Sequence, residues 1–269
     1  MKESIRASVL AFAALAAAGQ ASALESYVLY DNFQATALDP VRWFEGERSR
    51  TIGSNNLRLL HRDWGSTASD SGALPAQNWS ETIARSASVT QLRTTLKVNA
   101  LEVTGCGPNP TASSVRARVI GSFFNSGNRT SGNQIGDVLA QVWAVRASNS
   151  ADAPGVLRVE GWVGICTASD CSTTTQIGTN VPLGTVNVGT NVTMQVDWDR
   201  ANKQFLFSRD KGATTPVSYA GIDDSADPGT VFKNVSTRIT VANCASAPRT
   251  TGYIDARFDN VQVNTAAKP

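Results

Sequence analysis

Carboxylate side chains that share one face of a strand are the first candidates for chemistry in this sequence. Two pairs have the i, i+2 spacing that places both side chains on one face, Glu45/Glu47 and Asp197/Asp199. A retaining glycosidase needs two such carboxyl groups about 5–5.5 Å apart. Asp199, however, opens the segment Asp-Arg-Ala-Asn, where a short acidic side chain hydrogen-bonds the backbone of a turn. Glu47 stands among several arginines, which favours a structural ion pair over catalysis.

The single histidine, His61, is the other candidate for a general base. A Ser-His-Asp hydrolase or a polysaccharide lyase usually needs a histidine or a tyrosine in that role. His61 lies at the end of an expected strand beside Arg62 and Asp63, and the sequence contains no Gly-x-Ser-x-Gly motif. We expect an exposed histidine without a catalytic function. The sequence therefore gives no positive indication of an enzyme.

Alternating residues on several expected strands give a stronger signal. In segment 156–165, Leu157 and Val159 share one face, while polar and aromatic side chains share the other. Segments 114–124, 137–146 and 191–199 alternate in a similar way. If these strands are neighbours in one sheet, their faces combine into a polar surface. That surface would contain Arg116, Arg118, Gln141, Trp143, Arg158, Glu160, Trp162, Gln195 and Asp197.

This combination of side chains suits a carbohydrate ligand. Indole rings stack on the apolar faces of sugars, and fixed polar groups bind hydroxyls. If the arginines dominate, an anionic sugar such as a uronate is favoured, because guanidinium groups bind carboxylates in a bidentate manner. The alternative is an ordinary solvated sheet face with cross-strand Arg/Glu pairs. Trp143 could equally belong to the core, since its face also carries Leu139 and Val145.

The elements that must position these side chains are β-strands. Segments rich in valine, threonine and aromatic residues recur between turn signals. The predicted strands span residues 51–60 (after a turn), 87–98, 114–124, 137–146, 156–166, 191–199, 204–209 and 236–241, and residues 61–77 are predicted as a surface loop. The opening segment Tyr27–Phe33 and the closing segment Tyr253–Val263 are expected to pair. About ten strands predict a two-sheet sandwich or a barrel.

Residues 1–23 have the pattern of a bacterial Sec-type signal peptide. Lys2 and Arg6 precede an apolar run, and Ala21-Ser-Ala23 offers small residues for cleavage. No later stretch approaches the ~20 apolar residues that a membrane helix needs. We therefore expect a secreted or periplasmic protein with one domain, residues 24–269, and no membrane insertion. The formal net charge of only +2 gives no indication of a nucleic-acid partner.

Four cysteines in an exported chain predict disulfide bonds. Three pairings are possible. The short segment from Cys166 to Cys171 favours a turn closed by its own bridge, which leaves Cys106 to pair with Cys244. A zinc site is the alternative, but one histidine and the lack of metal-type spacing argue against it.

Three motifs spread over the chain carry a family resemblance. They are Asp-x-Phe (31–33) followed by Leu-Asp-Pro-x-x-Trp (38–43), the hairpin 192–207, and Ala-Arg-Phe-Asp-Asn-Val-Gln-Val (256–263). Together they resemble the concanavalin A-like lectin/glucanase superfamily. The resemblance implies an all-β, two-sheet antiparallel jelly-roll sandwich that binds ligands on its concave sheet. The catalytic motif of the superfamily's laminarinase-type glucanases, Glu-x-Asp-x-x-Glu or Glu-x-Asp-x-Glu, is absent from this sequence.

The resemblance also implies a structural Ca²⁺ near the paired terminal strands, where a carboxylate and backbone carbonyls hold the ion in many members. Asp31 and Asp259 are the matching residues here. Hydrogen bonds or a salt bridge with Arg257 are the alternative for both. No other cofactor is expected.

The leading functional hypothesis is non-catalytic binding of a carbohydrate or another extracellular polymer. In it, Trp143 and Trp162 stack on sugars while Arg116, Arg118, Arg158 and Glu160 bind polar groups. One alternative is a glycoside hydrolase or polysaccharide lyase with atypical catalytic residues. The other is a structural or adhesion protein of the cell surface or matrix.

Overall fold

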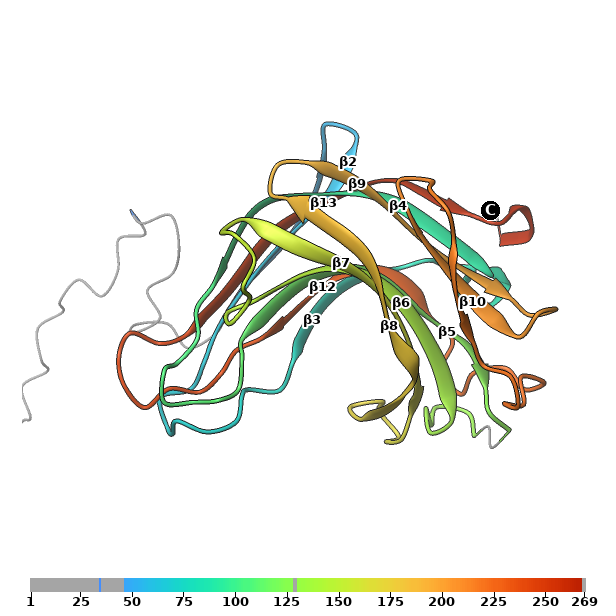
Figure 1. Ribbon diagram of the computed structural model, residues 1–269, viewed down its shortest axis with the longest axis horizontal. Coiled ribbons are helices and arrows are strands. Elements are labelled where there is room, and N and C mark those ends of the chain that lie inside the picture. The colour runs from blue at the N-terminus through green and yellow to red at the C-terminus, as the bar shows by residue number, and fades with distance from the viewer. Residues whose placement is uncertain (1–33, 35–45, 128–129, 268–269) are drawn as a thin grey trace, which may run out of the picture. The chain divides into compact units, whose positions relative to one another are not determined.

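The computed structural model describes Gln34, residues 46–127 and residues 130–267, and its strands form two antiparallel sheets (Figure 1). The seven-stranded sheet has, in spatial order, β1 (Glu47–Gly53), β2 (Asn56–Trp64), β13 (Thr251–Val263), β4 (Gln91–Val103), β9 (Asn191–Asp199), β10 (Gln204–Arg209) and β11 (Thr215–Ser218). The six-stranded sheet has β3 (Gln77–Thr82), β12 (Lys233–Thr240), β5 (Ser114–Asn125), β6 (Asp137–Ala147), β7 (Val156–Cys166) and β8 (Thr174–Asn187). Two short 3₁₀ helices span Ser86–Ser88 and Thr265–Ala267. The predicted fold class, an all-β sandwich of two antiparallel sheets, is confirmed.

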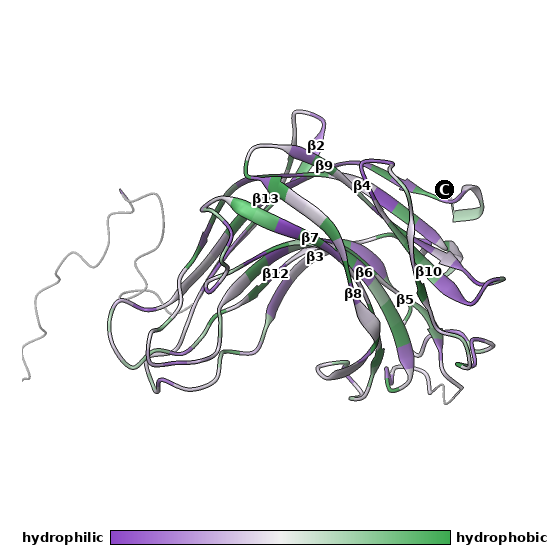
Figure 2. Ribbon diagram, in the orientation of Figure 1, coloured by the Kyte–Doolittle hydropathy of each residue, from purple (hydrophilic) through white to green (hydrophobic). Residues whose placement is uncertain are grey.

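The core lies between the two sheets and follows the alternation of the strands. On β5, Val115, Ala117 and Val119 are fully buried, whereas the residues between them face the opposite side of the sheet. The inward side chains of both sheets form one apolar cluster that includes Phe207 and Phe258. Burying an aliphatic or aromatic side chain of this size contributes roughly 1.5–3 kcal/mol. Figure 2 shows hydrophilic and hydrophobic residues alternating along the strands.

Both sheets are arched, and the six-stranded sheet forms the inner, concave side of the arch (Figure 1). The face of this sheet that is turned away from the core is therefore the concave surface that is predicted to bind a ligand. The hairpin 192–207 corresponds to β9 and β10, and the closing motif lies on β13 between β2 and β4. The opening segment Tyr27–Phe33, the motif at 38–43 and the predicted signal peptide lie outside the described residues.

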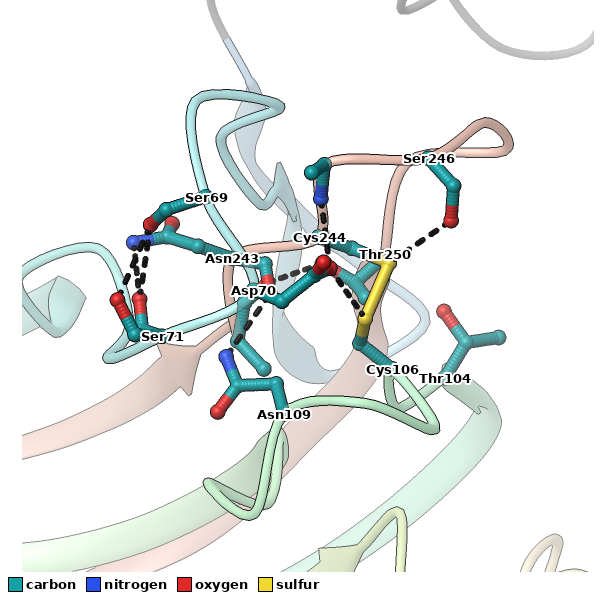
Figure 3. Close-up of a disulfide and its surroundings, with 12 residues drawn as sticks. Ser69, Asp70, Ser71, Thr104, Cys106, Asn109, Asn243, Cys244, Ser246 and Thr250 are labelled. Carbon is teal, nitrogen blue, oxygen red and sulfur yellow. Dashed lines mark hydrogen bonds between the residues drawn. A yellow bond between two sulfur atoms is a disulfide. The ribbon is translucent and has the colours of Figure 1, made fainter.

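Both predicted disulfides are confirmed. Cys106 pairs with Cys244, and Cys166 pairs with Cys171. Figure 3 shows that the Cys106–Cys244 bridge joins two loops and that Asp70 lies beside it. The Asp70 carboxylate accepts a hydrogen bond from the backbone N–H of Ala245. Asp70 and the two sulfurs lie close together, but bridged sulfurs are not metal ligands. Among the described residues no helix is long and apolar enough to cross a membrane.

Candidate functional site: a groove on the concave sheet

A groove of about 590 Å³ lies on the face of the six-stranded sheet that is turned away from the core. This volume falls within the range of ligand-binding clefts. Alternate residues of β3, β12, β5, β6 and β7 form its floor, because neighbours along a strand point to opposite faces. Five of the side chains predicted from the sequence line it: Arg116, Arg118, Gln141, Trp143 and Trp162.

The strand register brings these five residues together. Arg118 on β5 lies opposite Trp143 on β6, and Gln141 on β6 lies opposite Trp162 on β7. Arg116 follows two residues before Arg118 on the same face. Neighbouring positions on adjacent strands are about 4.8 Å apart, so the five side chains form one continuous patch.

Arg118 is fixed in the floor of the groove. Its side chain is buried, and three partners on three neighbouring strands accept hydrogen bonds from its guanidinium group. They are Ser236 Oγ at 3.1 Å, Gln141 Oε1 at 2.9 Å and Asn78 Oδ1 at 2.8 Å. All three are neutral oxygens. Burial lowers the pKa of Arg118, and the positive charges of Arg238 and Arg116 lower it further.

Arg116 and Arg238 form a cross-strand pair of like charges. They occupy opposite positions on β5 and β12. In the described part of the chain neither is in an ion pair, and the Nε atom of each is buried without a hydrogen-bond partner. Burial and the neighbouring Arg238 lower the pKa of Arg116 to about 10, which leaves it charged at neutral pH. Like charges directly opposite each other destabilise a sheet, so this pair needs a reason other than folding.

The two indoles of the groove have different roles. Trp143 is only 5% exposed, and the guanidinium carbon of Arg116 lies 5.0 Å from the centre of its ring. Its Nε1 donates a hydrogen bond of 3.2 Å to Glu160. Trp143 is therefore a support beneath Arg116 and Trp162 and offers little surface for stacking on a sugar. The expectation that Trp143 stacks on the ligand is corrected in this respect.

Trp162 is half-buried and keeps part of its ring accessible in the groove. Its centroid lies 6.4 Å from that of Trp143. The ring lies over Gly164, because a Cβ atom added at Gly164 would come within 2.3 Å of the Trp162 ring. A glycine at this position allows the indole to lie along the sheet, and it is thus the available stacking surface.

The loop closed by the Cys166–Cys171 disulfide forms one wall of the groove. Asp170, Cys171 and Ser172 all line it. Cys166 and Cys171 pack with Trp162 in a small apolar cluster. Hydrogen bonds from Ser172 lower the pKa of Asp170, so its exposed carboxyl group is ionised at neutral pH.

Two predicted residues lie beside the groove and are held by other contacts. Glu160 accepts hydrogen bonds from Trp143 and from Asn180 Nδ2, the latter at 3.1 Å, and so positions the Trp143 ring. Arg158 is exposed and pairs with Asp152, at 2.7 Å. Both lie on the concave face of β7, but neither lines the groove.

Asp197 does not join this surface. Its strand, β9, pairs with β4 and β10 in the seven-stranded sheet, so Gln195 and Asp197 face the opposite side of the sandwich. The expectation that this strand neighbours the others in one sheet is wrong. Alternation determines which residues share a face of a strand, but it does not determine which sheet the strand enters. Burial raises the pKa of Asp197, whose Oδ2 accepts a hydrogen bond of 2.6 Å from Gln195.

The prediction of an exposed histidine is also wrong. His61 is fully buried between the sheets. Its Nε2 lies 2.7 Å from Asp63 Oδ2, and its Nδ1 lies 3.1 Å from Thr237 Oγ1 on β12 of the other sheet. β2 continues past His61 to Trp64, so the imidazole points inward where a surface loop was expected. This buried network links the two sheets on the inner face of β12, which is the side opposite the groove.

The carboxylate pairs have the structural contacts expected of them. Asp199 accepts hydrogen bonds from the backbone N–H and the side-chain amide of Asn202, which confirms its role in the turn. Glu47 lies 3.6 Å from Arg62 Nε in an ion pair. Glu45 lies outside the described residues.

The calcium site stays a prediction. Asp31 lies outside the described residues. Both carboxylate oxygens of Asp259 accept hydrogen bonds from Asn260, one from its backbone N–H and one from its side chain. The Asp259 backbone carbonyl accepts a hydrogen bond from Thr94 Oγ1 at 2.9 Å.

Sequence reasoning missed the contribution of β12 and β3. Asn234, Ser236 and Arg238 alternate with Val235, Thr237 and Ile239, the same pattern that identified the residues of β5. That pattern could have found Arg238. Its position opposite Arg116 could not be found, because β12 and β5 are more than 100 residues apart in the chain.

Comparisons with known proteins yielded structural similarity only. No family model and no curated protein sequence matches the chain. Alginate lyase A1-II′ of family 7 has a TM-score of 0.42 and 13% identity, over 84% of this chain and 86% of that one. The legume lectin-like domain from Entamoeba histolytica has a TM-score of 0.35 and 11% identity, over 89% of this chain and 99% of that one. The VIP36 exoplasmic/lumenal domain in a Ca²⁺- and Man3GlcNAc-bound form has a TM-score of 0.36 and 7% sequence identity, over 82% of this chain and 84% of that one. The likeness concerns the fold alone, and the functional argument depends on the groove itself.

Proposed function

We propose that the protein binds an acidic polysaccharide, such as a polyuronate, in the groove of its concave sheet. The observation that carries this proposal is the group of three arginines, Arg116, Arg118 and Arg238, none of which forms an ion pair among the described residues; the charge of Glu160 acts on Arg116 only from beyond ion-pair distance. We refer to these residues as the arginine cluster. Removing charges from water without pairing them costs several kcal/mol per ion, so a stable protein rarely retains such a cluster without a use for it.

A carboxylate ligand would supply the missing counter-charge. Guanidinium groups bind carboxylates through parallel hydrogen bonds, and such charge-assisted bonds are about twice as strong as neutral ones. Arg118 is already held by three neutral partners, so little side-chain entropy remains to be lost when a ligand binds. The accessible ring of Trp162 beside the cluster favours a sugar over a simple anion, because an indole stacks on the apolar face of a pyranose.

The other polar groups of the groove fit this ligand class. Amide and hydroxyl groups of residues such as Asn78, Asn234 and Thr82 line it. These groups can donate to or accept from sugar hydroxyls. Among the described lining residues, Asp170 provides the carboxylate, and it lies on the loop at the wall.

Affinity electrophoresis of the chain from residue 24 onward tests the proposal. Gels containing polygalacturonate, alginate, xylan or no polymer would be run with wild type, Trp162→Ala and Tyr253→Ala. Tyr253 is an aromatic residue on the outer face of the other sheet, stacked with Arg62, and serves as the matched control. We expect an acidic polymer to retard wild type and Tyr253→Ala, and to retard Trp162→Ala much less.

The alternatives give different results in the same experiment. New reducing ends or unsaturated products in the same incubations would place the protein among the hydrolases or lyases. If no polymer retards the wild type, the proposal is wrong. A structural or adhesive role is then the better hypothesis.

The two disulfides fit an oxidising compartment, such as the periplasm or the cell exterior. We infer that the chain is exported, as its first 23 residues predict. N-terminal sequencing of the protein recovered from culture medium or periplasm would test this, and an intact Met1 would contradict it.

A further inference from the structure

The two ends of the groove carry opposite charge. The arginine cluster lies on β5 and β12, whereas Asp170 lies on the Cys166–Cys171 loop that follows β7. Trp162 on β7 packs against this loop. The groove is therefore positive over one pair of strands and has an ionised carboxylate on the loop against which its indole packs.

The two ends are far enough apart to hold different units of one chain. β5 and β7 are separated by β6 and so lie about 10 Å apart, and Trp162 is level with Ile120, two residues further along β5 than Arg118. A polysaccharide that crosses the strands can place one sugar at the arginine cluster and a later one on Trp162. The indole offers an uncharged face for that second sugar.

The negative charge of Asp170 disfavours the binding of an acidic sugar on the ring of Trp162. The pKa of Asp170 is lowered by hydrogen bonds from Ser172, so it stays ionised down to acidic pH. A second carboxylate bound next to it would meet a like charge, and like charges brought together oppose binding of the wrong partner. The disulfide limits the freedom of this short loop, because the bridged residues are only five positions apart.

We propose that the groove selects a polysaccharide that contains both acidic and neutral sugars, with an acid at the arginine cluster and a neutral ring on Trp162, at the end of the groove that carries Asp170. The inference depends on the proposed function of the same groove. It adds a specificity-determining residue, Asp170, and narrows the ligand from any polyanion to a mixed chain.

Titrations monitored by intrinsic tryptophan fluorescence test this, with three probes of equal length. Tetragalacturonate carries an acid on every unit, a hyaluronan tetrasaccharide carries one on alternate units, and xylotetraose carries none. Each would be titrated into wild type, Asp170→Asn and, as a matched control, Asp152→Asn. Asp152 is a half-buried surface carboxylate that pairs with Arg158 away from the lining residues. The substitution Asp170→Asn keeps the size of the side chain and removes only its charge.

We expect wild type to bind the alternating probe more tightly than tetragalacturonate. Asp170→Asn should bind tetragalacturonate about 2- to 5-fold more tightly than wild type, as expected for one partly exposed charge. Its affinity for the alternating probe should change less than 1.5-fold, and Asp152→Asn should behave like wild type. Equal gains for both acidic probes, or no gain for tetragalacturonate, would overturn the inference while leaving acidic-polysaccharide binding intact. No response to either acidic probe would count against both proposals.

Discussion

Arginines on the two outer faces of this sandwich are in contrasting surroundings. On the seven-stranded sheet, Arg58 forms two hydrogen bonds of 2.9 and 3.0 Å with the carboxylate of Asp255, and Arg62 lies 3.6 Å from both Glu47 and Glu102. On the six-stranded sheet, the arginine cluster has amide and hydroxyl partners or none. Arg58 and Arg62 are thus paired with carboxylates, whereas the arginine cluster has no ion pair among the described residues. Arg257 on β13 is an exception on the seven-stranded sheet, because it lies opposite Arg58 and Lys97 and its Nε is buried without a hydrogen-bond partner in the described part of the chain.

This difference separates two reasons for placing an arginine on a sheet. Cross-strand pairs of opposite charge contribute roughly 0.2–1 kcal/mol each to sheet stability. The groove arginines gain nothing of this kind and lose hydration, as the lowered pKa values of Arg116 and Arg118 indicate. Folding explains the paired arginines, whereas the unpaired arginine cluster that lines the groove calls for a ligand.

The largest effect should follow from removing the unpaired charges. In the double variant Arg116→Gln/Arg238→Gln, we expect affinity for an acidic polysaccharide to fall at least about 100-fold, since each charge-assisted hydrogen bond contributes about 1.5–3 kcal/mol. Arg58→Gln, on the other face, should bind as wild type does. Isothermal titration calorimetry would measure both. Similar losses in the two variants would mean that total charge, and not the groove, determines binding.

Lys233, on the inner face of β12, sharpens the comparison, because it is a buried cation that no ligand can reach. Lys233 is 2% exposed, and its Nζ donates to the carbonyl oxygens of Ser86 and Ser122. Burial lowers its pKa from 10.5 to about 8. Between pH 8 and 10.5 the unfolded chain holds this proton and the folded chain does not. Stability should therefore rise with pH across that window, by at most about 3 kcal/mol, and should not change on this account below pH 8.

Urea unfolding at pH 7.5, 9 and 10 would measure the rise. Lys233→Met removes the titrating group and should flatten this component of the profile, which separates it from the tyrosines and other lysines that titrate nearby. An unchanged pH slope in the variant would show that Lys233 does not have the lowered pKa.

Stability measurements on single arginines should differ in sign between the faces. Arg58→Met leaves the buried carboxylate of Asp255 without its partner and should cost about 1–2 kcal/mol in the free energy of unfolding. Arg238→Met removes a desolvated charge next to Arg116 and should be neutral or stabilising, by up to about 1 kcal/mol. Urea denaturation at pH 7 would compare them. A clear loss of stability in Arg238→Met would indicate that the groove arginines are needed for folding.

The strands that carry most of the groove were predictable from local sequence. β7 and the first half of β5 alternate apolar and polar residues, and β6 is a nearly continuous apolar run bounded by polar residues. The predicted ranges of all three agree closely with the observed ones. β8 was missed because Gly178, Pro182 and Gly184 interrupt the alternation and most of its side chains are exposed, as befits an edge strand with bulges.

The parts that escaped prediction depend on contacts between distant segments. Asp197 was assigned to the wrong face because the sequence does not show that β9 pairs with β4. Arg238 was missed because only the long-range pairing of β12 with β5 places it beside Arg116. His61 was predicted as exposed because its partner Thr237 lies 176 positions away. Alternation gives the face of each strand, and the pairing of strands then decides which faces build one site.

Salt should give the smallest difference between the two faces. The range of electrostatic interactions between exposed charges shrinks from about 10 Å at 0.1 M salt to about 3 Å at 1 M. Raising NaCl from 0.05 to 0.5 M should weaken the binding of an acidic polysaccharide several-fold. The groove is open to solvent, so salt screens the attraction between the arginine cluster and the ligand. The free energy of unfolding should change by no more than about 0.5 kcal/mol, since pairs such as Arg58–Asp255 are in direct contact and exposed pairs contribute little. Affinity that is the same at both salt concentrations would mean that stacking on Trp162, and not the arginine cluster, supplies most of the binding energy.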